Sequence, residues 1–224
     1  MAFFSEDFLR FFIELAPNNN KEWFDLNRKR YERNVKESFR EFVQHLITCL
    51  SKKDPTFKDL EAKDCIFRIN RDIRFSNDKS PYKLFVSAVI APGGKKSKAV
   101  NGIYFELGPE HIRVYGGIYE IDKEDLQIVR EGIAADPDGF RKAYTNEHFV
   151  KVFGGTIQGE KNKVLPKELK SAAEIEPLIF NKQWYFYTEF DADIVLKEDL
   201  DALILDCYEA GRPVENYFNK LIKR

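Results

Sequence analysis

The sequence predicts an α+β fold, with a mostly antiparallel sheet of about five strands packed against a long N-terminal helix and C-terminal helices. Apolar residues recur at three- and four-residue steps near both ends of the chain, as in amphipathic helices. Between residues 65 and 119 they alternate with polar residues, and turns rich in Gly and Pro separate the alternating segments. The chain has 224 residues, 43% of them hydrophobic, which is enough apolar material for one core. We therefore expect a single α+β domain over residues 1–224.

Two helices are expected at the N-terminal end. Ser5 is placed to cap a helix over Glu6–Leu15. Asn19, with Glu22 three residues later, resembles a capping box that opens a long helix over Lys21–Leu50.

Five segments alternate as strands do. The turn residues between the first four favour an antiparallel meander, and the last is strongly aromatic. The five are Cys65–Phe75, Tyr82–Ala91, Val100–Leu107, Ile112–Tyr119 and Trp184–Phe190.

The remaining segments are predicted to be helices. Asp122 and Asp136, the latter followed by Pro137, are expected to cap two of them. The others are Asn146–Phe153, Lys167–Ile175, and two closing helices, Lys197–Ala210 and Val214–Ile222, which Gly211 and Pro213 separate.

Charge is balanced overall but uneven along the chain. The net charge is -1, which excludes general polyanion-binding character. Residues 66–98, however, carry eight Lys or Arg against two Asp, and Lys95, Lys96 and Lys98 lie at an expected hairpin tip.

Composition also bears on location. The longest apolar run, Leu84–Ala91, is too short to span a bilayer, so no membrane association is expected. Three cysteines without paired spacing favour buried free thiols in a reducing compartment, and we expect a cytoplasmic protein. Nothing in the sequence specifies an oligomeric state.

The strongest functional signal is the run from Phe67 to Lys83. If Cys65–Phe75 is a strand, its side chains point alternately to two faces. One row is largely apolar and is the expected covered face: Phe67, Ile69, Arg71, Ile73 and Phe75. The other row is ionic or amide: Arg68, Asn70, Asp72 and Arg74.

This polar row predicts a site for a small anion, because the planar arginine fork suits carboxylate and phosphate. The expected ligand-binding residues are Arg68, Asn70, Arg74, Lys79 and Lys83. The alternative is a solvated sheet face on which Asp72 pairs with Arg74 and nothing binds.

Arg71 stands in the apolar row, where an unpaired charge would be costly. A structural ion pair is therefore expected for it. Its candidate partners are Glu106, Glu189 and Asp191.

Asp72 and Tyr82 are weak candidates for catalysis. Neighbouring cations favour the ionised form of Asp72 and weaken it as a base, and Tyr82 is a candidate proton donor. The segment from Asp78 to Pro81 has two interpretations: a turn in which Asp78 bonds its own backbone, or a loop that brings Lys79, Tyr82 and Lys83 to the site.

The same run carries a family resemblance. Arg68, Arg71-Asp72, Arg74-Phe75, Asp78-Lys79 and Pro81-Tyr82-Lys83 match the hallmark of the largely bacterial domain-of-unknown-function family 2461, which this chain resembles. Similar patterns occur in residues 18–31, in residues 114–119 and at Arg130. Leu84 stands where a small hydroxyl residue is common, and Glu120-Ile121 replaces a proline region. The resemblance implies a single-domain protein and brings no mechanism with it.

Three functions remain open. The leading one is a pocket for a small anionic ligand, with or without enzymatic activity, and the others are nucleic-acid binding through the basic 66–98 segment and a protein-interaction module. Nucleic-acid binding is disfavoured because contact with phosphates generally uses a broad basic face, and the rest of the chain is acidic. His45, His111 and His148 show no metal-ligand spacing, and no nucleotide-binding glycine motif occurs, so no metal or cofactor is expected.

Overall fold

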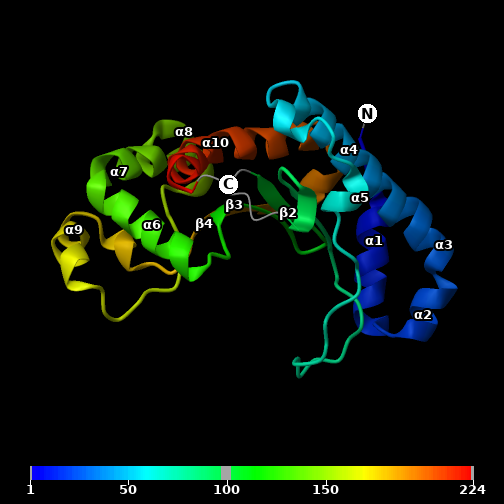
Figure 1. Ribbon diagram of the computed structural model, residues 1–224. Coiled ribbons are helices and arrows are strands. Elements are labelled where there is room, and N and C mark those ends of the chain that lie inside the picture. The colour runs from blue at the N-terminus through cyan, green and yellow to red at the C-terminus, as the bar shows by residue number, and fades with distance from the viewer. Residues whose placement is uncertain (1, 97–101, 223–224) are drawn as a thin grey trace. The chain divides into compact units, whose positions relative to one another are not determined.

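The computed structural model describes residues 2–96 and 102–222 (Figure 1). These residues group into two compact units. The first unit contains residues 2–96, 104–114 and 189–205, and the second contains residues 102–103, 115–188 and 206–222. Strands β3 (His111–Ile118) and β4 (Trp184–Asp191) and helix α10 (Leu200–Leu221) each contribute residues to both units.

One antiparallel sheet of four strands runs in the order β1-β2-β3-β4, which confirms the α+β class. Strands β1 (Val86–Ile90) and β2 (Ile103–Leu107) precede β3 and β4. The expected number of about five strands is too high by one. Val100, at the start of an expected strand, and Lys98, at the expected hairpin tip, lie outside the described residues.

The prediction of a strand over Cys65–Phe75 is wrong. Only Ile66 and Asn70 in this segment form isolated bridges, to Ala88 and Tyr82. The physical reason is Pro81, which accepts a hydrogen bond from the Arg71 amide at 2.9 Å but has no N–H to return. Beyond that point side chains of the segment bond their own backbone, and no ladder continues.

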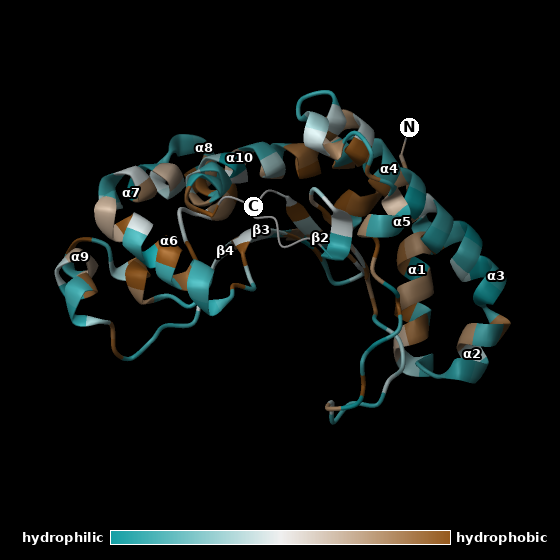
Figure 2. Cartoon of the chain, in the orientation of Figure 1, coloured by the Kyte–Doolittle hydropathy of each residue, from teal (hydrophilic) through white to brown (hydrophobic). Residues whose placement is uncertain are grey.

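Helix α1 (Glu6–Leu15) forms where expected and buries an aromatic face. In Figure 2 it is largely brown, whereas the following helices α2 (Lys21–Leu26) and α3 (Arg28–Tyr31) are mostly teal. Its buried side chains are Phe8, Leu9, Phe11, Phe12 and Leu15.

The long helix predicted over Lys21–Leu50 is interrupted. Asn27 departs from helical geometry between α2 and α3, and a π-helical segment, Glu32–Glu37, precedes α4 (Ser38–Ser51). As expected for the long helix, α4 packs on the sheet: the ring centroids of Phe39 and Phe42 lie 5.9 and 6.0 Å from that of Phe105 in β2.

The capping box at Asn19 is also wrong. Asn20 caps α2, because its side chain accepts a hydrogen bond from the Trp23 amide at 2.9 Å. The Asn19 side chain instead forms hydrogen bonds with the backbone of Tyr82.

A four-residue helix, α5 (Ala62–Cys65), leads into the charged segment. Lys95, expected to be solvated, donates from its ammonium to the Lys63 and Ile66 carbonyls at 2.9 and 3.0 Å. Lys95 therefore supplies hydrogen-bond donors to backbone carbonyls at the C-terminal end of α5. The 3-10 helices of the chain are Ala16–Asn18, Pro55–Phe57, Gly94–Lys96, Lys167–Leu169, Pro177–Phe180 and Ala192–Leu196.

In the second unit, three helices begin where they were expected, two of them at the predicted caps Asp122 and Asp136. Asp122, Asp136 and Asn146 each accept a hydrogen bond from a backbone amide of the first turn. The helices they cap are α6 (Lys123–Ala135), α7 (Pro137–Thr145) and α8 (Glu147–Phe153). The predicted Lys167–Ile175 helix divides into a 3-10 turn and α9 (Lys170–Ile175).

The two closing helices form one helix, α10, which contains Pro213. Val214 and Phe218 are fully buried one and five residues beyond the proline. Packing of this apolar face outweighs the local preference of Gly211 and Pro213 for a break.

Two glycines make room for the ring of Phe186 in the second unit. A Cβ atom on Gly116 would lie 2.6 Å from the Phe186 ring, and one on Gly211 would lie 2.8 Å from it. Both distances are below van der Waals contact, so any larger side chain at either position requires the ring to move.

Beside these glycines lies a buried acid. Glu215 of α10 is 1% exposed, and within the described residues its Oε2 atom has no hydrogen-bond partner. Burial raises the pKa of Glu215 to about 8, although backbone hydrogen bonds from Gly117 and Gly102 and the charge of Arg212 act in the opposite direction.

The described helices include none whose length and apolar character would let it cross a membrane. The three cysteines are free thiols, of which Cys65 and Cys207 are buried and Cys49 is half-buried.

Candidate functional site

Residues 66–85, here called the charged hairpin, extend from the first unit as a long two-stranded loop, drawn teal to green in Figure 1. Two backbone hydrogen bonds hold its two sides together: Lys83 N donates to Ile69 O at 2.8 Å, and Arg71 N donates to Pro81 O. A third joins it to β1, because Phe67 N donates to Ser87 O at 3.0 Å. The charged motif is therefore presented on a narrow hairpin rather than on a sheet face.

The alternation predicted for this segment survives in part. The polar row Arg68, Asn70, Asp72 and Arg74 is exposed throughout. In the apolar row only Ile69 is fully buried, and Phe75 is 95% exposed. The covered face expected to include Phe75 therefore ends before the tip of the hairpin.

Arg71 forms an ion pair, with Asp78 rather than with Glu106, Glu189 or Asp191. Its side chain is 27% exposed, and its guanidinium also donates to the Ser80 carbonyl at 3.1 Å. Since Asp78 lies within the same hairpin, the pair closes the tip locally.

Asp78 is the centre of this turn. Its Oδ1 atom accepts hydrogen bonds from the Ser80 amide at 2.9 Å and from the Ser80 hydroxyl at 2.7 Å. These bonds, and then Arg71, lower the pKa of Asp78 to about 2. Of the two interpretations of residues 78–81, the turn in which Asp78 bonds its own backbone therefore matches the contacts of Asp78.

Asp72 and Arg74 pair at the tip. The Arg74 Nε and Nη2 atoms donate to the two Asp72 oxygens at 2.9 and 2.7 Å, and the Arg74 side chain is 76% exposed. The hydrogen bonds from Arg74 lower the pKa of Asp72, which leaves it a weak proton acceptor. Lys79 is occupied as well, since its ammonium donates to the Ile73 carbonyl at 3.0 Å.

A cavity of about 530 Å³ lies at the base of the hairpin, in the first unit. Three segments far apart in sequence line it: Ala16 and Asn19 after α1, the turn 108–111 between β2 and β3, and the hairpin itself. The hairpin contributes Arg71, Asp72, Asp78, Ser80, Tyr82, Lys83, Leu84 and Phe85.

Asn19 fixes the hairpin to the helices beside this cavity. The Asn19 Nδ2 atom donates to the Tyr82 carbonyl at 2.9 Å, and the Tyr82 amide donates to Asn19 Oδ1 at 3.1 Å. One side-chain amide thus pairs with both backbone groups of Tyr82, as a neighbouring strand would. The Tyr82 ring stacks on Phe24, with centroids 4.0 Å apart.

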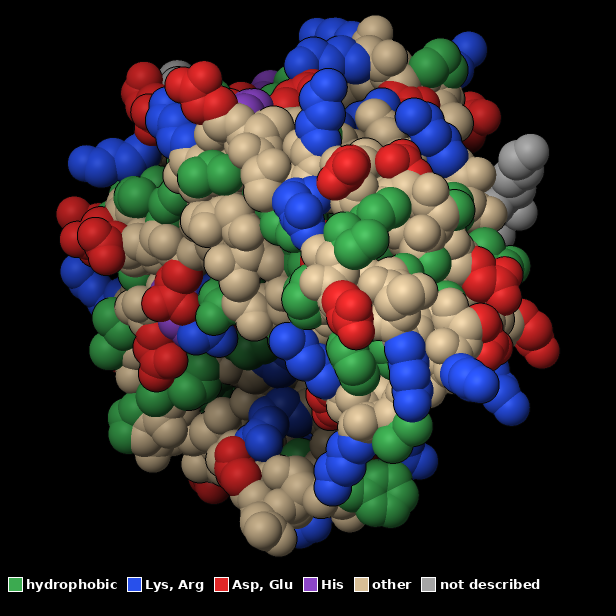
Figure 3. All heavy atoms as spheres, turned by 90° about the vertical axis from the view of Figure 1, so that its left-hand side faces the viewer, with side chains coloured by type: hydrophobic (Ala, Val, Ile, Leu, Met, Phe, Trp, Pro, Cys, Tyr) green, Lys and Arg blue, Asp and Glu red, His purple; other side chains and the backbone are tan. Residues whose placement is uncertain are grey.

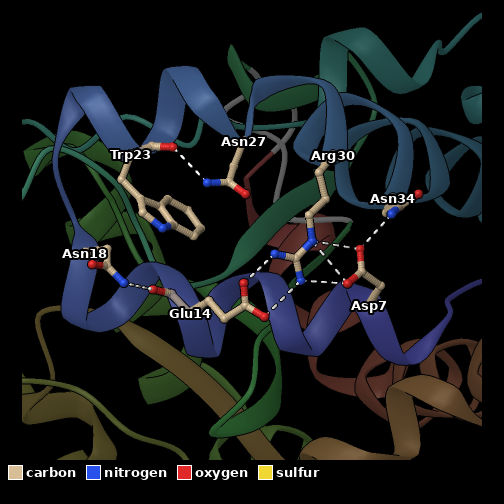
Figure 4. A network of polar contacts seen from close by, with 7 residues as sticks. All are labelled: Asp7, Glu14, Asn18, Trp23, Asn27, Arg30 and Asn34. Carbon is tan, nitrogen blue, oxygen red and sulfur yellow. Dashed lines mark hydrogen bonds and ion pairs between the residues drawn. The ribbon is translucent and has the colours of Figure 1, made fainter.

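A polar network holds the helices that carry Asn19 (Figure 4). Arg30 donates from Nη2 to Asp7 at 2.6 Å and from Nη1 to Glu14 at 2.5 Å, which ties α3 to both ends of α1. Asn34 also donates to Asp7, at 2.6 Å. Asn18 donates to the Glu14 carbonyl at 2.9 Å, so the residue before Asn19 is fixed to α1.

Lys83 is the unusual charge of the cavity wall. Its ammonium lies 5.6 and 5.5 Å from the ring centroids of Phe67 and Phe85. Over residues 2–96 and 102–222, it has neither a hydrogen-bond nor an ion-pair partner. Burial lowers the pKa of Lys83, while the charge of Glu106 raises it.

The structure brings together only some of the predicted site residues. Lys83, Arg71, Asp72 and Tyr82 line the cavity. Arg68, Asn70, Arg74 and Lys79 are exposed on the hairpin and do not line it.

Sequence reasoning missed every cavity residue outside the hairpin, including the polar residues Asn19, Glu110 and His111. Asn19 lies in the 18–31 segment and so had a signal as part of the family pattern, although its role was misread as a helix cap. No signal in the sequence indicates Glu110 and His111, because they reach the cavity only through the position of the β2–β3 turn beside the hairpin. No group of three or more His, Cys, Asp or Glu in the described part of the chain is arranged to hold a metal ion.

A family model described as conserved hypothetical protein (DUF2461) matches residues 7–217, which include all three segments of the cavity. No curated protein matches the chain.

Proposed function

The chain belongs to the DUF2461 family, and we propose that its first unit binds a small molecule carrying a carboxylate or phosphate group in the cavity at the base of the charged hairpin. The observation that carries this proposal is Lys83. The half-buried Lys83 ammonium makes no hydrogen bond or ion pair with the described residues, and the charge of Glu106 offsets its burial only in part. An anion that approaches it therefore adds stability, because water solvates the ammonium incompletely.

The other groups of the cavity support a ligand of mixed character. His111 and Arg71 add donors, although Asp78 already neutralises Arg71. Leu84, Phe85 and Pro109 add an apolar wall, as in most small-molecule sites. The ligand class that fits is therefore an organic acid or phosphate ester rather than a bare inorganic ion.

A second candidate function, binding of single-stranded nucleic acid, is favoured by one observation. Phe75 is 95% exposed at the tip of the hairpin, with the Arg74 guanidinium 5.8 Å from its ring centroid. Exposed aromatic rings beside cations stack on bases. Against it, Asp72 and Asp78 neutralise two of the arginines, and Figure 3 shows a face on which basic and acidic side chains are interspersed.

Thermal unfolding in the presence of succinate or a phosphate ester such as glycerol phosphate tests the leading proposal. Ligand that binds only the folded chain adds about 2.7 kcal/mol at a hundredfold excess over Kd. We expect wild type and Arg74→Lys to be stabilised and Lys83→Gln to lose the response. The reason is that Lys83 lines the cavity and Arg74 does not.

The two variants also separate the cavity from the exposed arginine row. Loss of the response in Arg74→Lys, with Lys83→Gln unaffected, would move the anion site to the hairpin tip. Stabilisation by a single-stranded oligonucleotide alone, abolished by Phe75→Ala and by added salt, would favour nucleic acid instead.

A further inference from the structure

One face of the sheet in the second unit carries a group of tyrosines. Side chains alternate along β3 and β4, so that Ile118, Trp184 and Phe186 are buried on one face. The opposite face, here called the tyrosine face, presents four rings: Tyr115, Tyr119, Tyr185 and Tyr187. Tyr119 is 66% exposed and Tyr187 is 42% exposed. Accessible aromatic patches of this kind mark interaction surfaces.

The four rings form two pairs with bare backbone between them. Tyr115 stacks on Tyr187, with ring centroids 5.3 Å apart, and Tyr119 meets Tyr185 edge to face at 5.4 Å. Gly117 lies between Tyr115 and Tyr119 along the chain. A Cβ atom on Gly117 would lie 2.4 Å from the Trp184 carbonyl oxygen, so no side chain fits between the pairs.

The spacing of the two pairs matches a polyproline II helix. Same-face positions of a strand lie about 6.7 Å apart, which separates Tyr115 from Tyr119 by about 13 Å and Tyr185 from Tyr187 by about 7 Å. The midpoints of the two pairs are therefore about 10 Å apart. A polyproline II helix repeats every three residues, or about 9.3 Å. Prolines three positions apart can thus lie on both pairs at once, as they do on other aromatic-lined recognition surfaces.

The polar groups around the tyrosine face also fit such a peptide. A polyproline II backbone makes no internal hydrogen bonds, so its carbonyls need donors. The hydroxyls of Tyr119, Tyr185 and Tyr187 form no hydrogen bond with the described residues and are available to donate. Directly after Tyr119, residues 120–125 carry four acids against one lysine. These charges favour a basic residue beside the prolines.

We propose that the tyrosine face binds a proline-rich segment in which two prolines are three positions apart and an arginine or lysine lies beside them. Residues 1–224 contain no two prolines with this spacing, so a second copy of them does not supply the segment. Single-stranded nucleic acid also stacks on aromatic rings, but the neighbouring acids repel its phosphates. The tyrosine face belongs to the second unit, and the proposal is therefore independent of the anion cavity in the first.

Isothermal titration calorimetry of the full chain with the synthetic peptide RPPAPPA tests the proposal. In the control peptide RPPAAAA, alanines replace the second pair of prolines, so that only one tyrosine pair can be occupied. We expect RPPAPPA to bind with a Kd at least about tenfold lower than that of RPPAAAA.

Variants locate the binding on the tyrosine face. Tyr119→Ala and Tyr187→Ala should each raise the Kd for RPPAPPA about tenfold, because each removes one ring of a pair. Phe75→Ala is the matched control, since it removes a 95% exposed ring from the first unit and should leave the Kd unchanged. Circular dichroism in urea checks that each variant folds. Tyr119 follows the end of β3, so its replacement tests the face even if Tyr187→Ala destabilises β4.

The charge requirement has its own variant. Glu120→Gln should raise the Kd for RPPAPPA on the order of twofold to fivefold, and should leave the Kd for the uncharged peptide APPAPPA unchanged. Equal effects on both peptides would overturn the role of the acidic segment.

Other results would overturn the proposal itself. These are the absence of binding by RPPAPPA, equal Kd values for RPPAPPA and RPPAAAA, and an effect of Phe75→Ala as large as that of the folded tyrosine variants. Tighter binding of oligothymidylate or of maltohexaose than of RPPAPPA, lost in Tyr119→Ala, would assign the tyrosine face to nucleic acid or carbohydrate instead.

Discussion

At the scale of single residues, the surroundings of a charge decide what it does. Arg71 and Arg74 stand three positions apart in one motif, yet both are satisfied by aspartates of the same hairpin. Lys83, further along the hairpin, has no hydrogen-bond or ion-pair partner among the described residues. The sequence predicted a concentration of charge here correctly, but it did not indicate which of the cations form ion pairs, because that depends on three-dimensional contacts.

Glu215 supplies the sharpest prediction at this scale. Its pKa of about 8 lies above the ordinary value of 4.5, so the folded chain holds a proton that the unfolded chain releases. The free energy of unfolding should therefore fall as the pH rises from 4.5 to 8, by up to about 1.4 kcal/mol per pH unit, and then level off.

Urea unfolding of wild type and Glu215→Gln at pH 5.5 and 8.5 measures this effect, because other titrating groups cancel in the difference. The variant should gain stability relative to wild type at the higher pH. A difference that is the same at both pH values would mean that Glu215 is ionised in the folded protein.

At the scale of elements, local signals predicted most helices, and tertiary contacts account for the errors. The caps at Asp122 and Asp136 were predicted correctly because capping is a local interaction. The single helix α10 was missed because burial of Val214 and Phe218 outweighs the glycine and proline before them. The false strand over Cys65–Phe75 arose from an alternating pattern, but the segment that faces it includes Pro81, which has no N–H to continue a ladder.

The Asn19 contact belongs to this scale, since one side chain joins the helical region to the hairpin. Asn19→Ala leaves both backbone groups of Tyr82 unpaired, and each neutral hydrogen bond contributes about 0.5–1.5 kcal/mol. We expect the variant to lose about 1–3 kcal/mol of stability in urea and to bind the acidic ligand more weakly.

Asn18→Ala is the matched control. Its exposed side chain makes a single bond to the Glu14 carbonyl, so its effect should stay within about 0.5 kcal/mol. Equal losses in the two variants would show that the Asn19–Tyr82 contact contributes nothing particular to the fold.

At the scale of the whole molecule, the sequence predicts one cooperative domain, whereas contacts group the described residues into two units. Tryptophan fluorescence can test whether the two units unfold together. It has two tryptophans, of which Trp23 lies in the first unit and Trp184 in the second. Trp23 packs against Phe11, and Trp184 is fully buried with its Nε1 atom donating to the Leu178 carbonyl at 2.9 Å.

Trp184→Phe and Trp23→Phe each leave one fluorescent reporter in one unit. We expect both to report the same urea midpoint as circular dichroism of that variant, because β3, β4 and α10 run through both units. A fluorescence midpoint that departs from the circular dichroism transition in either variant would show that the units unfold separately.

The ring of Phe186 between Gly116 and Gly211 has an evolutionary consequence. These three positions cannot vary independently, because a methyl group at either glycine would overlap the ring. A lineage that acquires alanine at one of the glycine positions must first have shortened residue 186, for example to leucine, since the opposite order passes through a clash. The structure thus specifies the order in which substitutions can accumulate, and aligned family members should show the three positions changing together.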